Sequence, residues 1–167
     1  MDQATQARLR TWLGERGHSV NLELSIKPLT GGQSNPTFLL STGSEKFVLR
    51  KKPDGVLLKS AHAIDREYRV ISALKDTLVP VPDALGWCDD ESIIGTPFYL
   101  MSYLDGRVFV DQSLPGMTPP ERAAIYGEMN RVISELHRLD IDAIGLGDYG
   151  KRDDYLSRQI TRWSSQL

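Results

Sequence analysis

The chain has 167 residues, of which 40% are hydrophobic, and its formal net charge is −2. This length suits one domain or one lobe of a larger protein, and the near balance of charge argues against nucleic acid as a partner, because such binders usually carry a clear basic excess. No apolar run approaches the ~20 residues of a membrane helix, and the polar N-terminus lacks a signal region. The lone Cys88 can form no internal disulfide, so we expect a cytoplasmic protein with no membrane partner.

The first part of the chain alternates helical and strand patterns. Apolar residues at helical spacing predict a helix over residues 2–16 and another over about 60–76. Short apolar runs bounded by Gly, Pro and polar residues predict strands, and these lie near 22–29, 37–42, 46–50, 84–88 and 97–103, with an acidic turn at 89–91.

The second part of the chain is helical. Thr118-Pro119-Pro120-Glu121 combines a Thr cap, early prolines and a Glu three positions after the cap, which predicts a helix over 118–139. A glycine-rich loop at 145–150 leads to a last helix from about residue 153. That last helix has an apolar stripe, which we expect to pack either on the 118–139 helix or on another piece of protein; the stripe consists of Leu156, Ile160, Trp163 and Leu167.

A glycine pair followed by small polar residues separates the first two predicted strands. Glycines at a hairpin turn let backbone N–H groups approach a bound anion closely. This pattern indicates a phosphate-binding loop, whose candidate residues are Gly31, Gly32, Gln33, Ser34 and Asn35.

The third predicted strand contains a candidate phosphate ligand. Side chains alternate between the two faces of a strand, so Val48 and Arg50 share one face and Phe47 and Leu49 share the other. If the two apolar residues pack into the core, Arg50 points toward the glycine loop, where a cation could hold nucleotide phosphates. The alternative is a charge in solvent at the strand end.

Glu67 falls within the apolar stripe of the 60–76 helix. A carboxylate on that face needs a partner, because an unpaired buried charge is costly. Arg50 on the neighbouring strand is a candidate partner. The alternatives are a surface arginine, Arg66 or Arg69, or a position at the edge of the stripe.

The stretch from Pro97 to Gly106 reads as a buried strand that runs out into a glycine turn. Such a stretch can present free backbone groups to the edge of an adenine ring. An ordinary core strand followed by a turn is the alternative.

These motifs occur in the order of a nucleotide-binding kinase lobe. The chain resembles the N-terminal part of the aminoglycoside phosphotransferase and choline kinase family, and most closely the branch related to kinase-like domains fused to acyl-CoA dehydrogenases. The resemblance spans about residues 22–165 and rests on five stretches, which are Leu29–Phe38, Phe47–Pro53, Arg66–Tyr68, Pro97–Gly106 and Leu136–His137.

The resemblance implies an α+β fold. Residues 1–104 would form a kinase-like N-lobe, with an antiparallel sheet of about five strands plus helices. Residues 105–167 would form the hinge exit and the first helices of an incomplete helical C-lobe.

The resemblance also implies an ATP site. The glycine loop, Gly31 to Asn35, would cover the phosphates, Arg50 would stand where such kinases place a phosphate-binding lysine, and Glu67 would be its ion-pair partner. Arginine in place of lysine is a departure that keeps the charge, and a shift of register would bring Lys51 or Lys52 to this place instead. The remaining implied ATP-binding residues are Val48, Met101 behind the adenine, and the hinge residues Ser102, Tyr103 and Leu104.

The catalytic loop of the family, with its metal-binding Asn and a later metal-binding Asp, has no match in this sequence. We read the superficially similar stretch His137–Asp140 as a helix end and Asp153-Asp154 as a helix start. The other histidines, His18 and His62, have no partner pattern and are expected to be structural. No catalytic or metal-binding residue is therefore predicted in this chain.

The sequence leaves three hypotheses, of which the third is a purely structural interaction domain whose glycine loop is only a hairpin turn and which binds no nucleotide. In the first, the intact protein transfers the γ-phosphoryl group of MgATP to a small-molecule hydroxyl, the Mg²⁺ ligands lie outside this chain, and the chain alone is inactive. In the second, the chain is a non-catalytic nucleotide-binding or scaffold module. The second hypothesis predicts that the apolar stripe of the last helix is buried against the 118–139 helix.

Overall fold

The structure is a computed structural model, and it describes residues 1–19, 24–29, 35–53, 55, 62–150 and 154–165. Within these residues the chain forms five helices and five strands. In chain order they are α1 (Gln3–Gly14), β1 (Ser25–Pro28), β2 (Thr37–Ser41), β3 (Lys46–Lys51), α2 (Ile64–Leu74), β4 (Ala84–Cys88), α3 (Glu91–Ile94), β5 (Phe98–Ser102), α4 (Pro119–Arg138) and α5 (Tyr155–Ser164).

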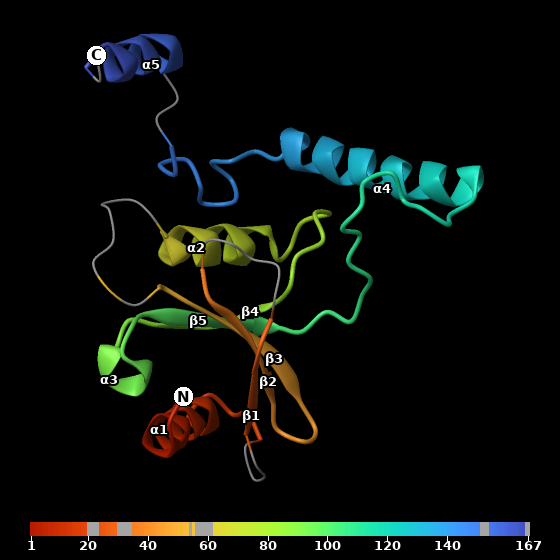
Figure 1. The fold of residues 1–167 in the computed structure, drawn as a ribbon. Helices are drawn as coiled ribbons and strands as arrows, with labels where there is room; N and C mark the ends of the chain where they lie inside the picture. Colours follow the sequence, from red (N-terminus) through yellow and green to blue (C-terminus); the bar gives the residue numbers. More distant parts are fainter. Residues whose placement is uncertain (20–23, 30–34, 54, 56–61, 151–153, 166–167) are drawn as a thin grey trace.

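The strands form one sheet in the order β1-β2-β3-β5-β4, and every neighbouring pair is antiparallel. The helix α2 lies over one face of the sheet and α1 lies at the opposite face, close to the short α3 (Figure 1). This arrangement confirms the predicted α+β class with a five-stranded antiparallel sheet. The central strand, β3, is therefore covered on both sides.

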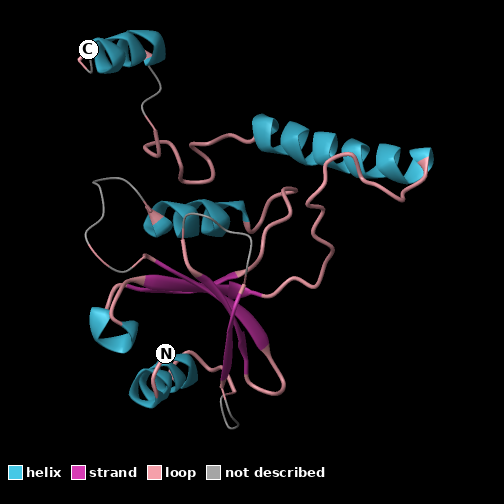
Figure 2. Cartoon of the chain, viewed as in Figure 1, coloured by secondary structure: helices cyan, strands magenta, loops and turns pink. Residues whose placement is uncertain are grey.

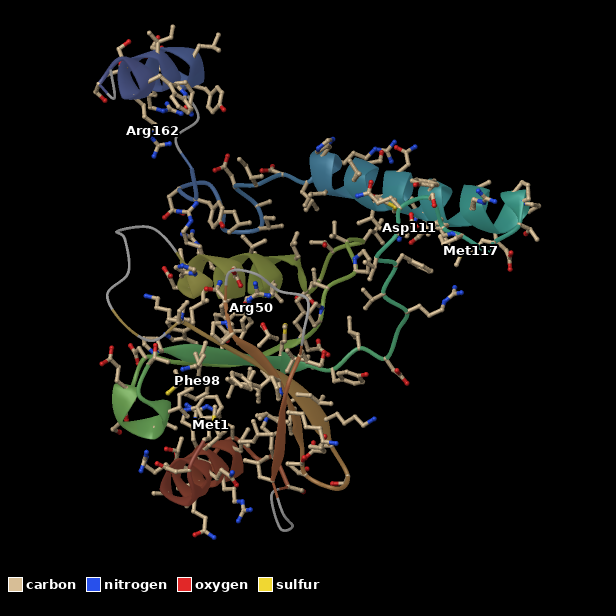
Figure 3. The ribbon with its side chains drawn as sticks, in the orientation of Figure 1. Met1, Arg50, Phe98, Asp111, Met117 and Arg162 are labelled. Atoms are coloured by element: carbon tan, nitrogen blue, oxygen red, sulfur yellow. The ribbon has the colours of Figure 1, made fainter. Side chains whose placement is uncertain are left out.

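The sheet register gives β3 and β5 two different faces. Leu49 pairs with Leu100 and packs toward α1, whereas Arg50 pairs with Tyr99 on the α2 side. Figure 3 shows Arg50 between the sheet and α2, with Phe98 on the other side of the sheet. The predicted alternation of the third strand is thus present.

The main hydrophobic core lies between α1 and the sheet. It includes an edge-to-face pair of Trp12 and Phe98, whose ring centroids are 4.9 Å apart, a geometry that aromatic rings favour. The buried residues packed around this pair include Leu9, Leu13, Leu24, Leu40, Phe47, Leu49, Cys88 and Leu100. Since this core fills the α1 face, the opposite face of the sheet can accommodate polar groups.

The helix α2 begins later than the sequence pattern predicts. His62 has a φ of 58°, in the left-handed region, and the helix starts at Ile64. Helix geometry requires a negative φ, so His62 lies outside the helix. Residues 60 and 61, where the predicted helix begins, lie outside the described residues.

The acidic turn at 89–91 contains the start of a short helix, α3, that the sequence analysis does not predict. The Asp90 side chain accepts a hydrogen bond from the Ser92 N–H at 2.9 Å, and Gly95 ends the helix at a φ of 87°. Caps at both ends satisfy much of the backbone of a one-turn helix, which explains why so short a segment is helical.

Helices α4 and α5 lie on the α2 side of the molecule, away from the sheet (Figure 2). The predicted capping box is present at the start of α4, where the Glu121 carboxylate accepts hydrogen bonds from the N–H and the hydroxyl of Thr118. In the parts of the chain that the structure describes, no helix has the combination of length and apolar composition that a membrane crossing requires.

The last helix does not pack on α4. In Figure 1, α5 stands apart from α4, and three residues of its apolar stripe are exposed: Leu156 by 74%, Ile160 by 67% and Trp163 by 66%. Leu167 lies outside the described residues. Of the two expectations for this stripe, packing on the 118–139 helix is not observed.

Candidate functional site

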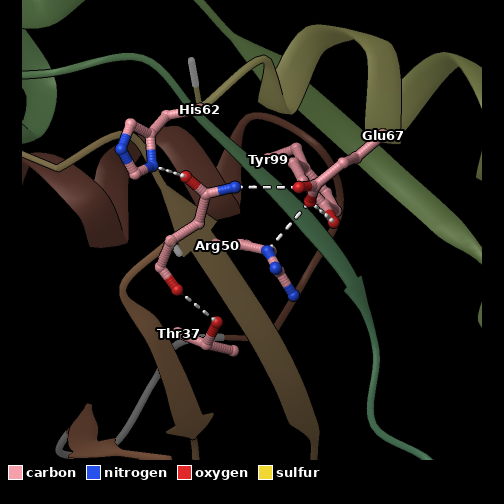
Figure 4. Close-up of polar contacts among 6 residues, drawn as sticks. Thr37, Arg50, His62, Glu67 and Tyr99 are labelled. Carbon is pink, nitrogen blue, oxygen red and sulfur yellow. Dashed lines mark hydrogen bonds and ion pairs between the residues drawn. The ribbon is translucent and has the colours of Figure 1, made fainter. Parts of the chain in front are cut away.

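An arginine, a glutamate and a tyrosine converge between the sheet and α2 (Figure 4). Arg50 projects from β3 and Glu67 from α2, and the Arg50 Nε lies 2.9 Å from the Glu67 Oε2. The Nε–H is not aligned with the oxygen for a hydrogen bond, so the contact is an ion pair. The partner that the sequence analysis suggests for Glu67 is therefore the one observed.

The alternative partners of Glu67 bind elsewhere. Arg66 donates a hydrogen bond to the Tyr149 carbonyl at 2.8 Å, and Arg69 pairs with the Asp148 carboxylate. Both arginines point from α2 toward the loop that precedes α5, and the pairing with a surface arginine is absent.

Asn35 connects the end of the predicted glycine loop to Glu67. Its Nδ2 donates to the Glu67 Oε1 at 2.8 Å, and its Oδ1 lies 3.0 Å from the His62 Nδ1. The Asn35 carbonyl also accepts a hydrogen bond from the Thr37 hydroxyl at 3.0 Å. Asn35 is only 3% exposed, and the side-chain contacts with Glu67 and His62 satisfy its buried carboxamide, whereas Thr37 binds its backbone carbonyl.

Tyr99 supplies a third partner for Glu67. Its hydroxyl donates to the Glu67 Oε2 at 3.2 Å. Burial of the phenol, followed by the nearby negative charge of Glu67, raises the pKa of Tyr99 above its ordinary value of 10.0, while Arg50 acts in the opposite direction. The hydroxyl therefore stays protonated and remains a donor at neutral pH.

The ion pair is accessible from one side. The Arg50 side chain is 26% exposed and that of Glu67 is 35% exposed. Partial desolvation strengthens the attraction between the two charges relative to water, while the exposed part leaves room for a ligand to reach the guanidinium.

Two predicted ATP-binding residues, Val48 and Met101, lie on the same face as Arg50. Val48 pairs with Met101 across β3 and β5, two residues along β3 from Arg50 and two residues along β5 from Tyr99. Val48 is buried and Met101 is half-buried. They form an apolar surface next to the cation.

The predicted hinge residues lie at the end of β5, where Ser102 is the last residue of the strand and Tyr103 and Leu104 follow it. The N–H of Ser102 donates to the Asp83 carbonyl and its hydroxyl accepts from the Asp83 N–H, both at 2.9 Å. Ser102 thus anchors Asp83, the residue before β4, and its own N–H is not available to a ligand. The N–H groups of Tyr103 and Leu104 donate to no residue that the structure describes.

The glycine-loop residues Gly31, Gly32, Gln33 and Ser34 lie outside the described residues. Their role as a phosphate loop stays a prediction. Asn35 is the loop position whose contacts are known, and they are made with protein groups.

Two members of this polar network, His62 and Tyr99, are not among the site residues predicted from the sequence. Tyr99 had a signal: it stands two positions before Met101 on the same strand, so the period of two places both on one face. His62 had none, because its contact with Asn35 joins residues 27 positions apart.

Within the described ranges, no three His, Cys, Asp or Glu side chains are grouped so that they could hold a metal ion. His137 lies in the last turn of α4 and Asp154 is the N-cap residue of α5, both at helix ends as predicted. Asp153 is outside the described residues.

Comparison with known proteins supplies the class. The family model described as "Phosphotransferase enzyme family" matches residues 25–167. The crystal structure of a putative aminoglycoside phosphotransferase from Ralstonia eutropha superimposes with a TM-score of 0.80 and 49% sequence identity, covering 96% of this chain and 46% of that chain. The chain therefore belongs to the phosphotransferase enzyme family, and its sheet and helices have the kinase-like N-terminal fold of such proteins.

The chain is also similar to acyl-CoA dehydrogenase family proteins. It is 51% identical to acyl-CoA dehydrogenase family member 10 of Mus musculus over 81% of this chain and 13% of that protein. It is also 51% identical to the probable acyl-CoA dehydrogenase IBR3 of Arabidopsis thaliana, over 86% of this chain and 18% of that protein. The identity to acyl-CoA dehydrogenase family member 11 of Rattus norvegicus is 45%, over 98% of this chain and 21% of that protein. The chain thus spans about a fifth or less of these relatives, and they confirm the branch that the sequence motifs indicate.

Proposed function

We propose that this chain is the ATP-binding portion of a phosphotransferase that moves the γ-phosphoryl group of MgATP to a hydroxyl of a small molecule. The observation that carries the proposal is the ion pair between Arg50 on β3 and Glu67 on α2. In kinase-like sites a strand cation held by a helix glutamate binds the phosphates of the nucleotide.

The proposed role of Arg50 and Glu67 is electrostatic. Phosphoryl transfer depends mainly on positioning and on neutralising phosphate charge. Arg50 would neutralise phosphate oxygens and Glu67 would hold Arg50 in place. Val48 and Met101 would contact the adenine, and the N–H groups of Tyr103 and Leu104, which donate to no described residue, are the hinge donors that remain available to it.

The proposal places Mg²⁺ and the catalytic base outside this chain. A metal bound between phosphates neutralises their charge, but the described residues contain no cluster of metal-ligating side chains and the sequence has no catalytic loop. We therefore expect no phosphotransfer by residues 1–167 alone. Metal-dependent phosphorylation of any acceptor by this chain would contradict that expectation.

The remainder of such an enzyme would also cover the exposed apolar face of α5. That face, formed by Leu156, Ile160 and Trp163, is unpartnered within the described residues. The similar phosphotransferase structure is about twice as long as the part matched here. The alternative of a self-sufficient non-catalytic nucleotide-binding or scaffold module expects the face to be buried on α4, so its exposure favours the first hypothesis.

Calorimetric titration with MgATP tests the nucleotide site. We expect the protein to bind MgATP, and both Arg50→Ala and Glu67→Ala to weaken binding by about tenfold or more, the effect of losing a charge-assisted contact. Arg131→Ala is the matched control, because it removes an exposed ion pair with Glu128 on α4 and leaves the site intact. A folded protein that does not bind MgATP at millimolar concentration would contradict the proposal.

A further inference from the structure

The Arg50 guanidinium meets Glu67 through one edge only. Arginine and a carboxylate frequently pair through two parallel N–H···O contacts, whereas here the closest atoms are Nε and Oε2, at 2.9 Å, and neither terminal nitrogen of Arg50 is joined to Glu67 by a hydrogen bond in Figure 4. Figure 4 shows the two terminal nitrogens of Arg50 on the side away from Glu67. Among the described residues, Glu67 is the one charged partner of Arg50.

The reason for this one-edge contact lies in the other partners of Glu67. The Oε1 atom, which a second guanidinium contact would need, accepts the Asn35 Nδ2–H at 2.8 Å. The Oε2 atom is shared between the Arg50 Nε and the Tyr99 hydroxyl. Asn35 and Tyr99, which donate these two hydrogen bonds, are buried. If the Glu67 carboxylate rotated to make two contacts with Arg50, one of these buried donors would lose its partner, which is costly.

The Asn35 carboxamide is held in one orientation. The Glu67 carboxylate can only accept hydrogen bonds, so the amide nitrogen of Asn35 faces it. The Asn35 Oδ1 then faces the His62 Nδ1 at 3.0 Å, where an Nδ1–H of the histidine would donate to it.

We propose that Asn35 and Tyr99 are positioning residues that confine Glu67 to the Nε edge of Arg50 and so keep both terminal nitrogens of the guanidinium free for a two-point contact with a nucleotide phosphate. The inference rests on the proposed function, since it assigns Arg50 to phosphate. It gives arginine in this position a property that lysine lacks, because a planar fork can serve Glu67 with one edge and a phosphate with another.

The experiment measures MgATP affinity by calorimetry in two backgrounds. In the protein with Arg50, Asn35→Ala frees Oε1, Glu67 takes a second guanidinium contact, and we expect affinity to fall about tenfold, the effect of one lost charge-assisted hydrogen bond. Tyr99→Phe leaves Asn35 in place and should cause a smaller loss. In the Arg50→Lys background, Asn35→Ala should have little further effect, because lysine has no second edge to protect.

Two controls separate positioning from damage to the fold. Thr37→Val removes the hydroxyl that binds the Asn35 carbonyl and leaves the carboxamide intact, so we expect unchanged affinity. Thermal unfolding followed by circular dichroism shows whether each variant folds. If Asn35→Ala does not fold, Tyr99→Phe in the same two backgrounds decides the question.

The possible results discriminate between the two proposals. Equal losses from Asn35→Ala in the unaltered protein and in the Arg50→Lys background would show that Asn35 touches the nucleotide or shapes the loop directly, and would overturn this inference alone. Unchanged affinity in both Asn35→Ala and Tyr99→Phe would do the same. Failure of the unaltered protein to bind MgATP would overturn the nucleotide site itself, and this inference with it.

Discussion

Glu67 collects partners from three separate parts of the chain: Asn35 before β2, Arg50 on β3 and Tyr99 on β5. Each partner donates to, or neutralises, a carboxylate that is only about one third exposed. Removing one partner leaves the others facing an incompletely paired charge. We therefore expect the free-energy changes caused by substituting these residues to be non-additive.

Tyr99 gives this unit a pH dependence. Burial and the Glu67 charge raise the pKa of Tyr99 above its ordinary value of 10.0, so the folded chain keeps this proton at a pH where the unfolded chain loses it. The free energy of unfolding should therefore fall as the pH rises above about 10. We expect the midpoint of urea unfolding to drop more between about pH 8 and about pH 10.5 in the unaltered protein than in Tyr99→Phe.

An exposed tyrosine provides the control for that measurement. Tyr155 lies on α5 and its ring is largely in solvent, so Tyr155→Phe should leave the pH dependence as it is. A drop of equal size in Tyr99→Phe and in the unaltered protein would contradict the assignment of the effect to Tyr99.

At the scale of elements, α2 is linked to the loop between α4 and α5. Arg69 donates to the Gly145 carbonyl at 2.7 Å and pairs with Asp148, and the hydrogen bond from Arg69 lowers the pKa of the Asp148 carboxyl. Arg66 binds the Tyr149 carbonyl and stacks on its ring, with the guanidinium carbon 3.9 Å from the ring centroid. The helix that carries Glu67 therefore also anchors the loop between α4 and α5.

Arg69→Ala should release this loop. Single exposed ion pairs contribute little to global stability, so we expect a local effect: faster amide hydrogen exchange over residues 144–149, with almost no change in the sheet. Hydrogen exchange followed by mass spectrometry makes the measurement. Arg131→Ala, which removes an exposed pair within α4, should leave the 144–149 segment unchanged, and equal exchange in the two variants would refute the link.

At the scale of the whole molecule, the apolar surface is distributed unevenly. The α1 side of the sheet is densely packed, whereas α4 has no buried residue and borders an open groove of about 610 Å³ that includes Phe109, Ile125, Met129 and Ile133. Exposed apolar areas of this kind mark interaction surfaces. The N-terminal part therefore has its own core, whereas the helical part exposes apolar surface.

Trp163 reports on the exposed apolar face of α5. Of the three tryptophans, Trp12 is buried and Trp163 is 66% exposed. We expect iodide to quench Trp163 fluorescence efficiently in this chain, and Trp163→Phe to remove most of the quenchable signal. In a protein that contains the rest of the phosphotransferase domain, the same tryptophan should be protected. Protection of Trp163 in residues 1–167 alone would instead support the self-sufficient module.

The sequence by itself was sufficient for features that depend on local periodicity. The alternation in β3 assigned Arg50 and Leu49 to opposite faces, the helical spacing put Glu67 on the inner side of α2, and the box of Thr118 and Glu121 located the start of α4. Such patterns depend on backbone geometry, which repeats every two or 3.6 residues.

Only the tertiary structure decided which polar groups meet. Asn35 and Tyr99 are each 32 positions from Glu67, and the positive φ of His62 delayed the start of α2. The tertiary structure also shows that α5 stands apart from α4. Periodicity assigns a residue to a face but not to a partner, because partners depend on strand register and on the placement of a helix over the sheet, and both are determined by packing across the whole fold.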